Sequence, residues 1–171
     1  MNKQQKQFLD NAFFSLTVRA AFPRSKTYRQ DAEDPGKKEF RRTLREQLEE
    51  LAQQYTVAVD EKTHIRNIEL LANSLSEEFA HVLHDGRFRI GSAQKVLNLH
   101  LKYLWCRDRI PMPPHCPFDS AIIGDLPGCS HIKWTTLDNI EDYRRLVEAA
   151  RAKAGDDSLA RWELGVYNSA D

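Results

Sequence analysis

Residues 90–106 read IGSAQKVLNLHLKYLWC, and this stretch decides the fold. Its apolar side chains point to nearly every side of a helical wheel: Val96, Leu97, Leu99, Leu101, Tyr103, Leu104 and Trp105. A helix that is apolar on most of its faces is covered by other elements on several sides. The stretch therefore predicts a buried central helix over about residues 92–106.

The segments on both sides of this stretch repeat apolar residues every three or four positions, which is the helical period. They predict amphipathic helices over about residues 7–21, 37–54, 64–83, 118–127, 138–154 and 158–168. Pro23, Pro35 and Gly36 predict a loop over residues 22–36, and residues 55–59 could be extended. Since no repeat or linker interrupts the pattern, we expect residues 1–171 to form a single all-α globular domain.

The composition limits the class of protein. The 171 residues are 41% hydrophobic and 29% charged, with 7 Gly and 7 Pro, which excludes a wholly disordered, collagen-like or low-complexity chain. The apolar runs are too short to span a bilayer, and the first residues lack the apolar core of a secretory signal. Three cysteines argue against a disulfide framework. We therefore expect a cytoplasmic protein with no membrane partner.

The net charge is zero, but the charges are unevenly distributed. Residues 19–45 hold nine Lys or Arg against four Asp or Glu, and residues 86–118 hold six against one. These two basic blocks could form one face that binds an anionic partner, or they could be ordinary solvated helix faces. The amphipathic helix over residues 37–54 could form a homodimer surface, although contact with the core is the commoner use of such a face.

A polar stripe runs along the predicted central helix. Lys95, Asn98 and Lys102 occupy positions i, i+3 and i+7, which share one helical face. Such a stripe is costly in an interior unless its groups are paired or face a cleft. A Lys that is partly withdrawn from water can lose its proton and act as a nucleophile that forms a Schiff base. The alternative is that both lysines extend into solvent from the outer face of the helix.

Asp119 follows a proline-rich segment, residues 111–117, and stands at a predicted helix start. At that position an Asp commonly acts as an N-cap, because its carboxylate accepts hydrogen bonds from the first free N–H groups. The prolines before it also hold its backbone in a fixed direction. Asp119 is therefore a candidate both for a cap and for a reactive carboxylate.

Together, these features resemble the helix-hairpin-helix DNA glycosylases, and among them the 8-oxoguanine type. Those all-α enzymes have a Gly-containing hairpin, then a Lys that opens a buried helix, then Pro-x-Asp at the next helix start. The likeness covers residues 86–124, with Lys95 and Asp119 in the places of the Lys and the Asp, and Pro117 two residues earlier. The usual Gly-x-Gly of the hairpin is reduced to Gly91, which lies four positions before Lys95.

The resemblance implies a hydrolase and lyase that removes a damaged base from DNA and needs no cofactor. Lys95 would attack the anomeric carbon and form an imine, and Asp119 would stabilise the positive charge that develops on the deoxyribose. The base would be flipped out of the duplex. Asn98 and Lys102 would orient the site or contact phosphate, and Lys102 is a rival for the nucleophile. Candidates for stacking on the base are Trp105 and Phe118, together with Tyr103 and Trp134.

A second interpretation is a non-enzymatic all-α binding protein that docks nucleic acid or a protein partner through residues 19–45 and 86–118. The same region also resembles uncharacterised bacterial proteins with a Lys-Tyr-Leu-Trp-Cys run, a resemblance that implies no function. One feature distinguishes the two interpretations. A glycosylase needs Lys95 and Asp119 in one cleft, whereas a binding protein needs only the basic face.

Cysteine and histidine residues gather after the central helix: Cys106, His115, Cys116, Cys129 and His131. Four of them could hold zinc, but no Cys-x-x-Cys pair is present, so we predict no metal site and leave zinc as an open alternative. Cys116 with His115 or His131 could form a thiolate–imidazole nucleophile, although no orienting residue is evident. The sequence holds no Gly-rich phosphate loop, nucleophile elbow or His-Glu-x-x-His motif.

Overall fold

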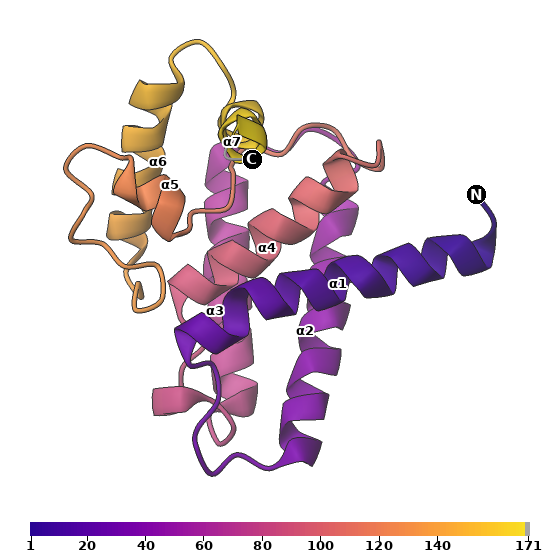
Figure 1. Cartoon of the computed structure of the whole chain (residues 1–171). Helices are drawn as coiled ribbons and strands as arrows, with labels where there is room; N and C mark the ends of the chain where they lie inside the picture. Colours follow the sequence, from indigo (N-terminus) through magenta and orange to yellow (C-terminus); the bar gives the residue numbers. More distant parts are fainter. Residues whose placement is uncertain (170–171) are drawn as a thin grey trace.

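A computed structural model describes residues 1–169 (Figure 1). Its regular secondary structure consists of helices joined by turns and loops. The helices are α1 (Lys3–Ser25), α2 (Asp34–Gln54), α3 (Glu61–Phe79), α4 (Ile90–Trp105), α5 (Ser120–Gly124), α6 (Ile140–Ala154) and α7 (Leu159–Ser169), with a 3₁₀ turn η1 (His84–Gly86). The only β-type pairing in the described residues is an isolated bridge between Tyr28 and Leu83. The prediction of a single all-α globular domain is confirmed.

Helix α4 is the central helix that the sequence predicted. Every residue from Ile90 to Leu99 is buried, and α4 contacts α1, α3, α2 and α6. The helix begins two residues earlier than predicted, so Gly91 lies in its first turn rather than in a hairpin before it. Within residues 1–169, no helix combines the length and the apolarity that crossing a bilayer requires.

Helices α2 and α3 run side by side in Figure 1 and supply one wall of the core. Phe40, Leu44 and Leu48 lie on one stripe of α2, and their side chains are completely buried. Because this apolar stripe is already covered within the chain, it cannot also form a homodimer surface. Of the two uses predicted for this helix face, contact with the core is the one that the structure shows.

Helix α1 is longer than the sequence predicted. It begins after Asn2, whose side chain accepts a hydrogen bond from the N–H of Gln5 while the Gln5 side chain accepts one from the N–H of Asn2. It continues through Pro23 and ends at Ser25, and the C-cap residue Lys26 adopts a left-handed conformation. Pro23 stands in the last turn, so it interrupts the helix only where the helix is already ending. The predicted break at Pro23 is wrong by one turn.

Two other loop predictions change in the structure. Pro35 does not break a helix but lies in the first turn of α2, where its missing N–H has no intrahelical partner to lose. Residues 55–59 are not extended: they form a turn that buries Tyr55 and leaves Val57 exposed. Helix α3 then begins after the N-cap Asp60, whose carboxylate accepts a hydrogen bond from the N–H of Thr63.

Candidate functional site

Lys95 and Asp119, which the sequence placed in one site, meet in the structure. The Nζ atom of Lys95 lies 3.0 Å from Oδ2 of Asp119, and only 7% of the lysine side chain is exposed. Helix α4 supplies the lysine, and the chain just before α5 supplies the carboxylate. The alternative in which Lys95 extends into solvent is therefore wrong. The Asp119 side chain is 32% exposed, so the pair is buried at the lysine and open to solvent at the carboxylate.

The two oxygens of Asp119 have different partners. Oδ1 accepts hydrogen bonds from the N–H groups of Ala121 and Ile122, both at 3.1 Å, so the residue is the N-cap of α5. Oδ2 is left to face Lys95. Partial burial acts to raise the pKa of Asp119, but the Lys95 charge and these hydrogen bonds outweigh it and lower the pKa below its ordinary value. The carboxylate is therefore ionised at neutral pH, and it serves both as the cap and as the partner of Lys95.

Gln94 fixes the backbone that carries Asp119. Its Nε2 donates to the carbonyl of Phe118 at 2.7 Å, and its Oε1 accepts from the N–H of Phe118 at 3.1 Å. Gln94 is completely buried and precedes Lys95 directly in α4. One helix therefore carries both the lysine and the amide that holds the aspartate opposite it. Sequence reasoning missed Gln94, although an amide in an otherwise apolar helix needs buried partners and was a usable signal.

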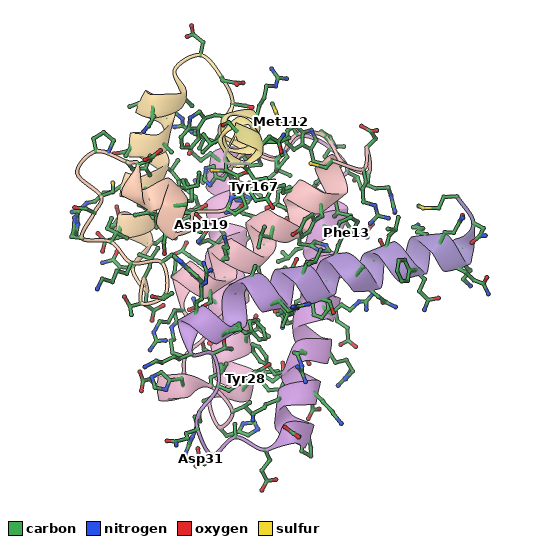
Figure 2. All side chains as sticks on the ribbon, in the orientation of Figure 1. Phe13, Tyr28, Asp31, Met112, Asp119 and Tyr167 are labelled. Carbon is green, nitrogen blue, oxygen red and sulfur yellow. The ribbon has the colours of Figure 1, made fainter. Side chains whose placement is uncertain are left out.

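The pair lines a cleft of about 460 Å³ between α1, α4 and α7. Figure 2 shows Asp119 and Tyr167 on the same side of the molecule, beside α5 and α7. Tyr167 lines the cleft, and its ring centroid lies 4.6 Å from Nζ of Lys102. Helix α1 contributes Arg19 and Arg24 to the cleft, and both side chains are exposed. The volume is within the range of small-ligand sites.

Lys102 lines the same cleft but has its own partner. Its Nζ lies 2.7 Å from Oε2 of Glu163 in α7, and the two side chains are only 12% and 7% exposed. The second lysine is therefore held by a second buried acid, and it also does not extend into solvent. Sequence reasoning missed Glu163, because nothing local in the α7 sequence marks it as the partner of a residue 61 positions away.

Trp134 packs next to the ammonium group of Lys95. The Lys95 Nζ atom is 5.8 Å from the Trp134 ring centroid, and the indole Nε1 donates to Oγ of Ser120. Only 1% of Trp134 is exposed, so its ring supports Lys95 from the core and is not open to a stacked base.

Three residues predicted to contact substrate lie elsewhere. Asn98 is completely buried and is bonded to His64, Gln94 and Tyr143, because its side chain turns into the core although it shares a helical face with Lys95. Phe118 is also completely buried, edge-on to Tyr143. Trp105 is partly buried against the core and does not line the cleft. None of the three lines the cleft. Asn98 bonds Gln94, which suits the predicted role of orienting the site rather than that of contacting phosphate.

The thiolate–imidazole alternative also fails. Burial raises the pKa of the Cys116 thiol and lowers the pKa of His115 to about 4, despite the opposing hydrogen bond from His115 to Glu61. A neutral thiol beside a neutral imidazole is a poor nucleophile. As for zinc, residues 1–169 contain no group of three or more His, Cys, Asp or Glu side chains that could hold a metal ion.

Gly91 does not offer its backbone to a ligand. Its N–H donates to the carbonyl of Leu137 at 2.8 Å, and the N–H of Ile90 donates to Oδ1 of Asp138 at 3.1 Å. The segment over residues 134–138 therefore occupies the place where a hairpin would present free N–H groups to a phosphate. Phosphate contacts near this cleft have to come from side chains.

The second basic block, residues 86–118, does not form an open basic face. Five of its six basic side chains are ion-paired in the structure: Arg87, Arg89, Lys95, Lys102 and Arg107. In the first block, the two arginines of the cleft, Arg19 and Arg24, form no ion pair with any residue of 1–169. The free positive charge beside the cleft therefore comes from α1.

A comparison of the chain with models of known protein families, with curated proteins and with solved structures found no match.

Proposed function

We propose that the cleft between α1, α4 and α7 cleaves N-glycosidic bonds in DNA, with Lys95 as the nucleophile and Asp119 as the stabilising carboxylate. The observation that carries the proposal is the 3.0 Å contact between these two side chains at the wall of one cleft. A glycosylase and lyase requires this convergence. A cap alone does not require Asp119 to face a lysine.

The chemistry follows from the two groups. The lone pair of the Lys95 amine forms a bond to C1′ while the bond from C1′ to the base nitrogen breaks. The electron pair of the broken bond leaves with the base, which takes up a proton. The ionised carboxylate stabilises the positive charge on the sugar during this step. The lysine nitrogen that is now bonded to C1′ then loses a proton. The C1′–O4′ bond opens, O4′ takes up a proton, and C1′ and the lysine nitrogen form the imine. The proton that the Lys95 ammonium must first lose passes to solvent in the cleft, so that the Asp119 carboxylate stays ionised for the step it stabilises.

The positive charge on α1 suits a phosphate-bearing substrate. Arg19 and Arg24 line the same cleft as Lys95 and are free to contact backbone phosphates. These two side chains would make the phosphate contacts that the backbone at Gly91 cannot make, because the Gly91 N–H is bonded to Leu137. Because these contacts are exposed, we expect DNA binding to weaken as the salt concentration rises.

Borohydride trapping tests the proposal directly. The protein is incubated with duplex oligonucleotides that carry 8-oxoguanine, uracil, an abasic site or only normal bases, and the mixture is then reduced. We expect a covalent protein–DNA band with the wild type on one damaged substrate and no band with Lys95→Gln. The matched control is Lys102→Arg, which keeps the charge beside Glu163 but removes the second amine of the cleft, and it should retain the band.

Asp119→Asn separates the cap from the charge. An asparagine oxygen can still accept from Ala121 and Ile122, so α5 should keep its N-cap. We expect single-turnover base release to slow by about a hundredfold or more, since the loss of one electrostatic stabiliser has this size of effect. Circular dichroism confirms that the variant is folded. A wild-type rate in Asp119→Asn, or a band that persists in Lys95→Gln, would show that the assigned roles are wrong.

A non-catalytic nucleic-acid-binding function is the second candidate, because a groove between α1 and α2 holds four arginines, of which Arg19 and Arg41 form no ion pair within residues 1–169. Arg19, Arg41, Arg42 and Arg45 line it together with the apolar residues Phe14 and Val18. The absence of any trapped band and of any base release, combined with salt-sensitive binding of an oligonucleotide that Arg19→Gln and Arg41→Gln weaken, would favour this function over the enzyme.

A further inference from the structure

A second cavity, of about 300 Å³, lies between the first half of α1, the end of α2 and the end of α4. Phe13, labelled in Figure 2, marks its wall on α1. Of the residues that line the Lys95 cleft, only Tyr103 also lines this cavity. The cavity is thus separate from the proposed reaction site, and its use does not depend on that proposal.

Two buried nitrogen atoms of side chains that line this cavity have no hydrogen-bond partner. They are Nε2 of His100 and Nη2 of Arg107. A buried polar nitrogen without a partner is costly, and native proteins rarely leave one in this state. Both side chains belong to the wall of one cavity, although the two atoms themselves are covered, so a polar ligand there would complete them after a small turn of each side chain.

The charges around the cavity favour an anion. Its basic side chains are Lys6, Arg45, Arg107 and Arg109, and its acidic ones are Asp10 and Glu49. The acids are used by two of the cations, since Arg107 lies 2.8 Å from Asp10 and Arg45 lies 2.8 Å from Glu49. Lys6 and Arg109 form no ion pair within residues 1–169. The lining therefore carries an excess of two positive charges.

His100 contributes a polar group without adding to this charge. Burial lowers its pKa to about 4, although Glu49 and Asp10 act to raise it, so the imidazole is neutral at physiological pH. A neutral imidazole can hold a proton on Nε2 and donate it to an oxygen of a ligand. Together with Nη2 of Arg107, this gives the wall of the cavity two unpartnered nitrogen donors, which are the groups from which a carboxylate accepts.

The rest of the lining is apolar and aromatic. Phe13 and Tyr103 stack with ring centroids 4.7 Å apart, and Leu104 and Ile110 lie beside them in the wall. The Arg107 guanidinium lies over the Phe13 ring at 5.1 Å, which places the charge directly against this apolar surface. A ligand that fits both parts has an anionic end and a compact apolar body.

From these observations we infer that this cavity is a binding site for a small aromatic carboxylate, whose carboxylate contacts His100 and Arg107 and whose ring packs against the apolar wall formed by Leu104, Ile110 and the stacked Phe13–Tyr103 pair. The cavity volume matches the lower end of small-ligand sites, which limits the ligand to about one ring with short substituents. The site is distinct from the Lys95 cleft and requires no chemistry on the ligand.

Benzoate is the probe that tests this inference, with benzamide as its neutral isostere and inorganic phosphate as an anion without an apolar body. The full chain is titrated with each while the side-chain NMR signals of His100 and the melting temperature are followed. We expect saturable binding of benzoate, a shift of the His100 signals and a rise in melting temperature. Benzamide and phosphate should each bind at least about tenfold more weakly.

The variants His100→Leu and Arg107→Gln should each raise the dissociation constant for benzoate about tenfold or more. His100→Leu removes a polar atom that has no partner, so it should fold at least as well as the wild type even if Arg107→Gln, which leaves Asp10 unpaired, does not. Arg66→Gln, an exposed arginine of α3 outside the cavity, is the matched control and should bind benzoate like the wild type.

Three results would overturn the inference. The first is the absence of saturable benzoate binding up to about 10 mM, where a specific contact of this kind should be visible. The second is equal binding of benzoate and benzamide, since the anion would then contribute nothing. The third is benzoate binding that is unchanged in His100→Leu, because the ligand would then lie elsewhere. Equal binding of phosphate would likewise exclude the aromatic part of the ligand.

Discussion

Replacing Gly91 by alanine is expected to lower the free energy of unfolding by about 3 kcal/mol, the upper end of the cost of overpacking a core. A Cβ atom at this position would lie 1.7 Å from the carbonyl oxygen of Trp134 and 2.8 Å from its carbonyl carbon. The obstacle is backbone, which cannot rotate away as a side chain can. Room for the methyl group requires the segment over residues 134–138 to move away from α4, and the hydrogen bond from Gly91 to Leu137 would then be lost.

Gly165→Ala is the control for this prediction. Gly165 lies inside α7, and nothing stands within 4 Å of the position of its Cβ. Since alanine favours a helix over glycine, this variant should be more stable than the wild type by up to about 1 kcal/mol. Urea denaturation followed by circular dichroism measures both. A Gly91→Ala protein within about 1 kcal/mol of the wild type would show that residues 134–138 are not held tightly against α4.

Gly91 also shows where a sequence pattern and the structure diverge. The resemblance of residues 86–124 to the helix-hairpin-helix glycosylases implies that this glycine belongs to a hairpin before the buried helix. In the structure the same glycine lies inside the helix, and what makes it necessary is the close approach of Trp134, 43 positions later in the sequence. A contact at that sequence separation depends on tertiary packing, which no local pattern records.

The helical class and the central helix could be predicted because they depend on local periodicity. The apolar residues of 90–106 and of 37–54 recur at the helical period, and burial of Leu97 and Leu44 follows from that period. Helix ends were less predictable, as Pro23 shows: its effect depends on whether it falls in the last turn of α1 or earlier, and composition does not distinguish these cases.

The site was predictable only in part, for the same reason. Lys95 and Asp119 each carried a local signal, one as a charge in an apolar helix and the other as a cap after prolines. Glu163, the partner of Lys102, carried no such signal, since it is one of many acidic residues. Gln94 carried one that was overlooked, because an amide in an otherwise apolar helix needs buried partners. The prediction that Asn98 faces the same site as Lys95 rested on their shared helical face, which fixes only the direction of the Cβ atom. The direction of the amide group depends on its hydrogen-bond partners His64 and Tyr143, which lie in the core.

The protein is expected to lose most of its stability as the pH falls from about 6.5 to about 4. In the folded chain, burial lowers the pKa of His100 and of His115 to about 4, from an ordinary value of 6.5. Burial also lowers the pKa of His64, and the nearby His115, whose ring centroid is 4.6 Å away, adds to this effect. All three imidazoles are therefore neutral in the fold over this range.

The sign of the effect follows from proton binding. Above pH 6.5 these histidines are neutral in both states and their titration contributes no slope. Between about 6.5 and 4 the unfolded chain binds protons that the folded chain does not, so acid favours unfolding. Each histidine then lowers the free energy of unfolding by about 1.4 kcal/mol per pH unit, or about 3 kcal/mol by pH 4. Two or three such groups together equal much of the stability of a typical domain.

Urea titrations at a series of pH values between 7.5 and 4.5 test this expectation. Near pH 5, the slope of the unfolding free energy against pH should correspond to an uptake of about two to three protons on unfolding, because three histidines that are neutral in the fold become protonated in the unfolded chain. His100→Leu should reduce that uptake by about one proton without breaking a hydrogen bond, because its Nε2 has no partner. If the free energy of unfolding stays level from pH 7 to pH 5, these histidines accept protons in the folded protein and the prediction is wrong. Such protonation requires solvent to reach His64 and His115, whose hydrogen bonds to Asn98 and Tyr143 hold them in the core.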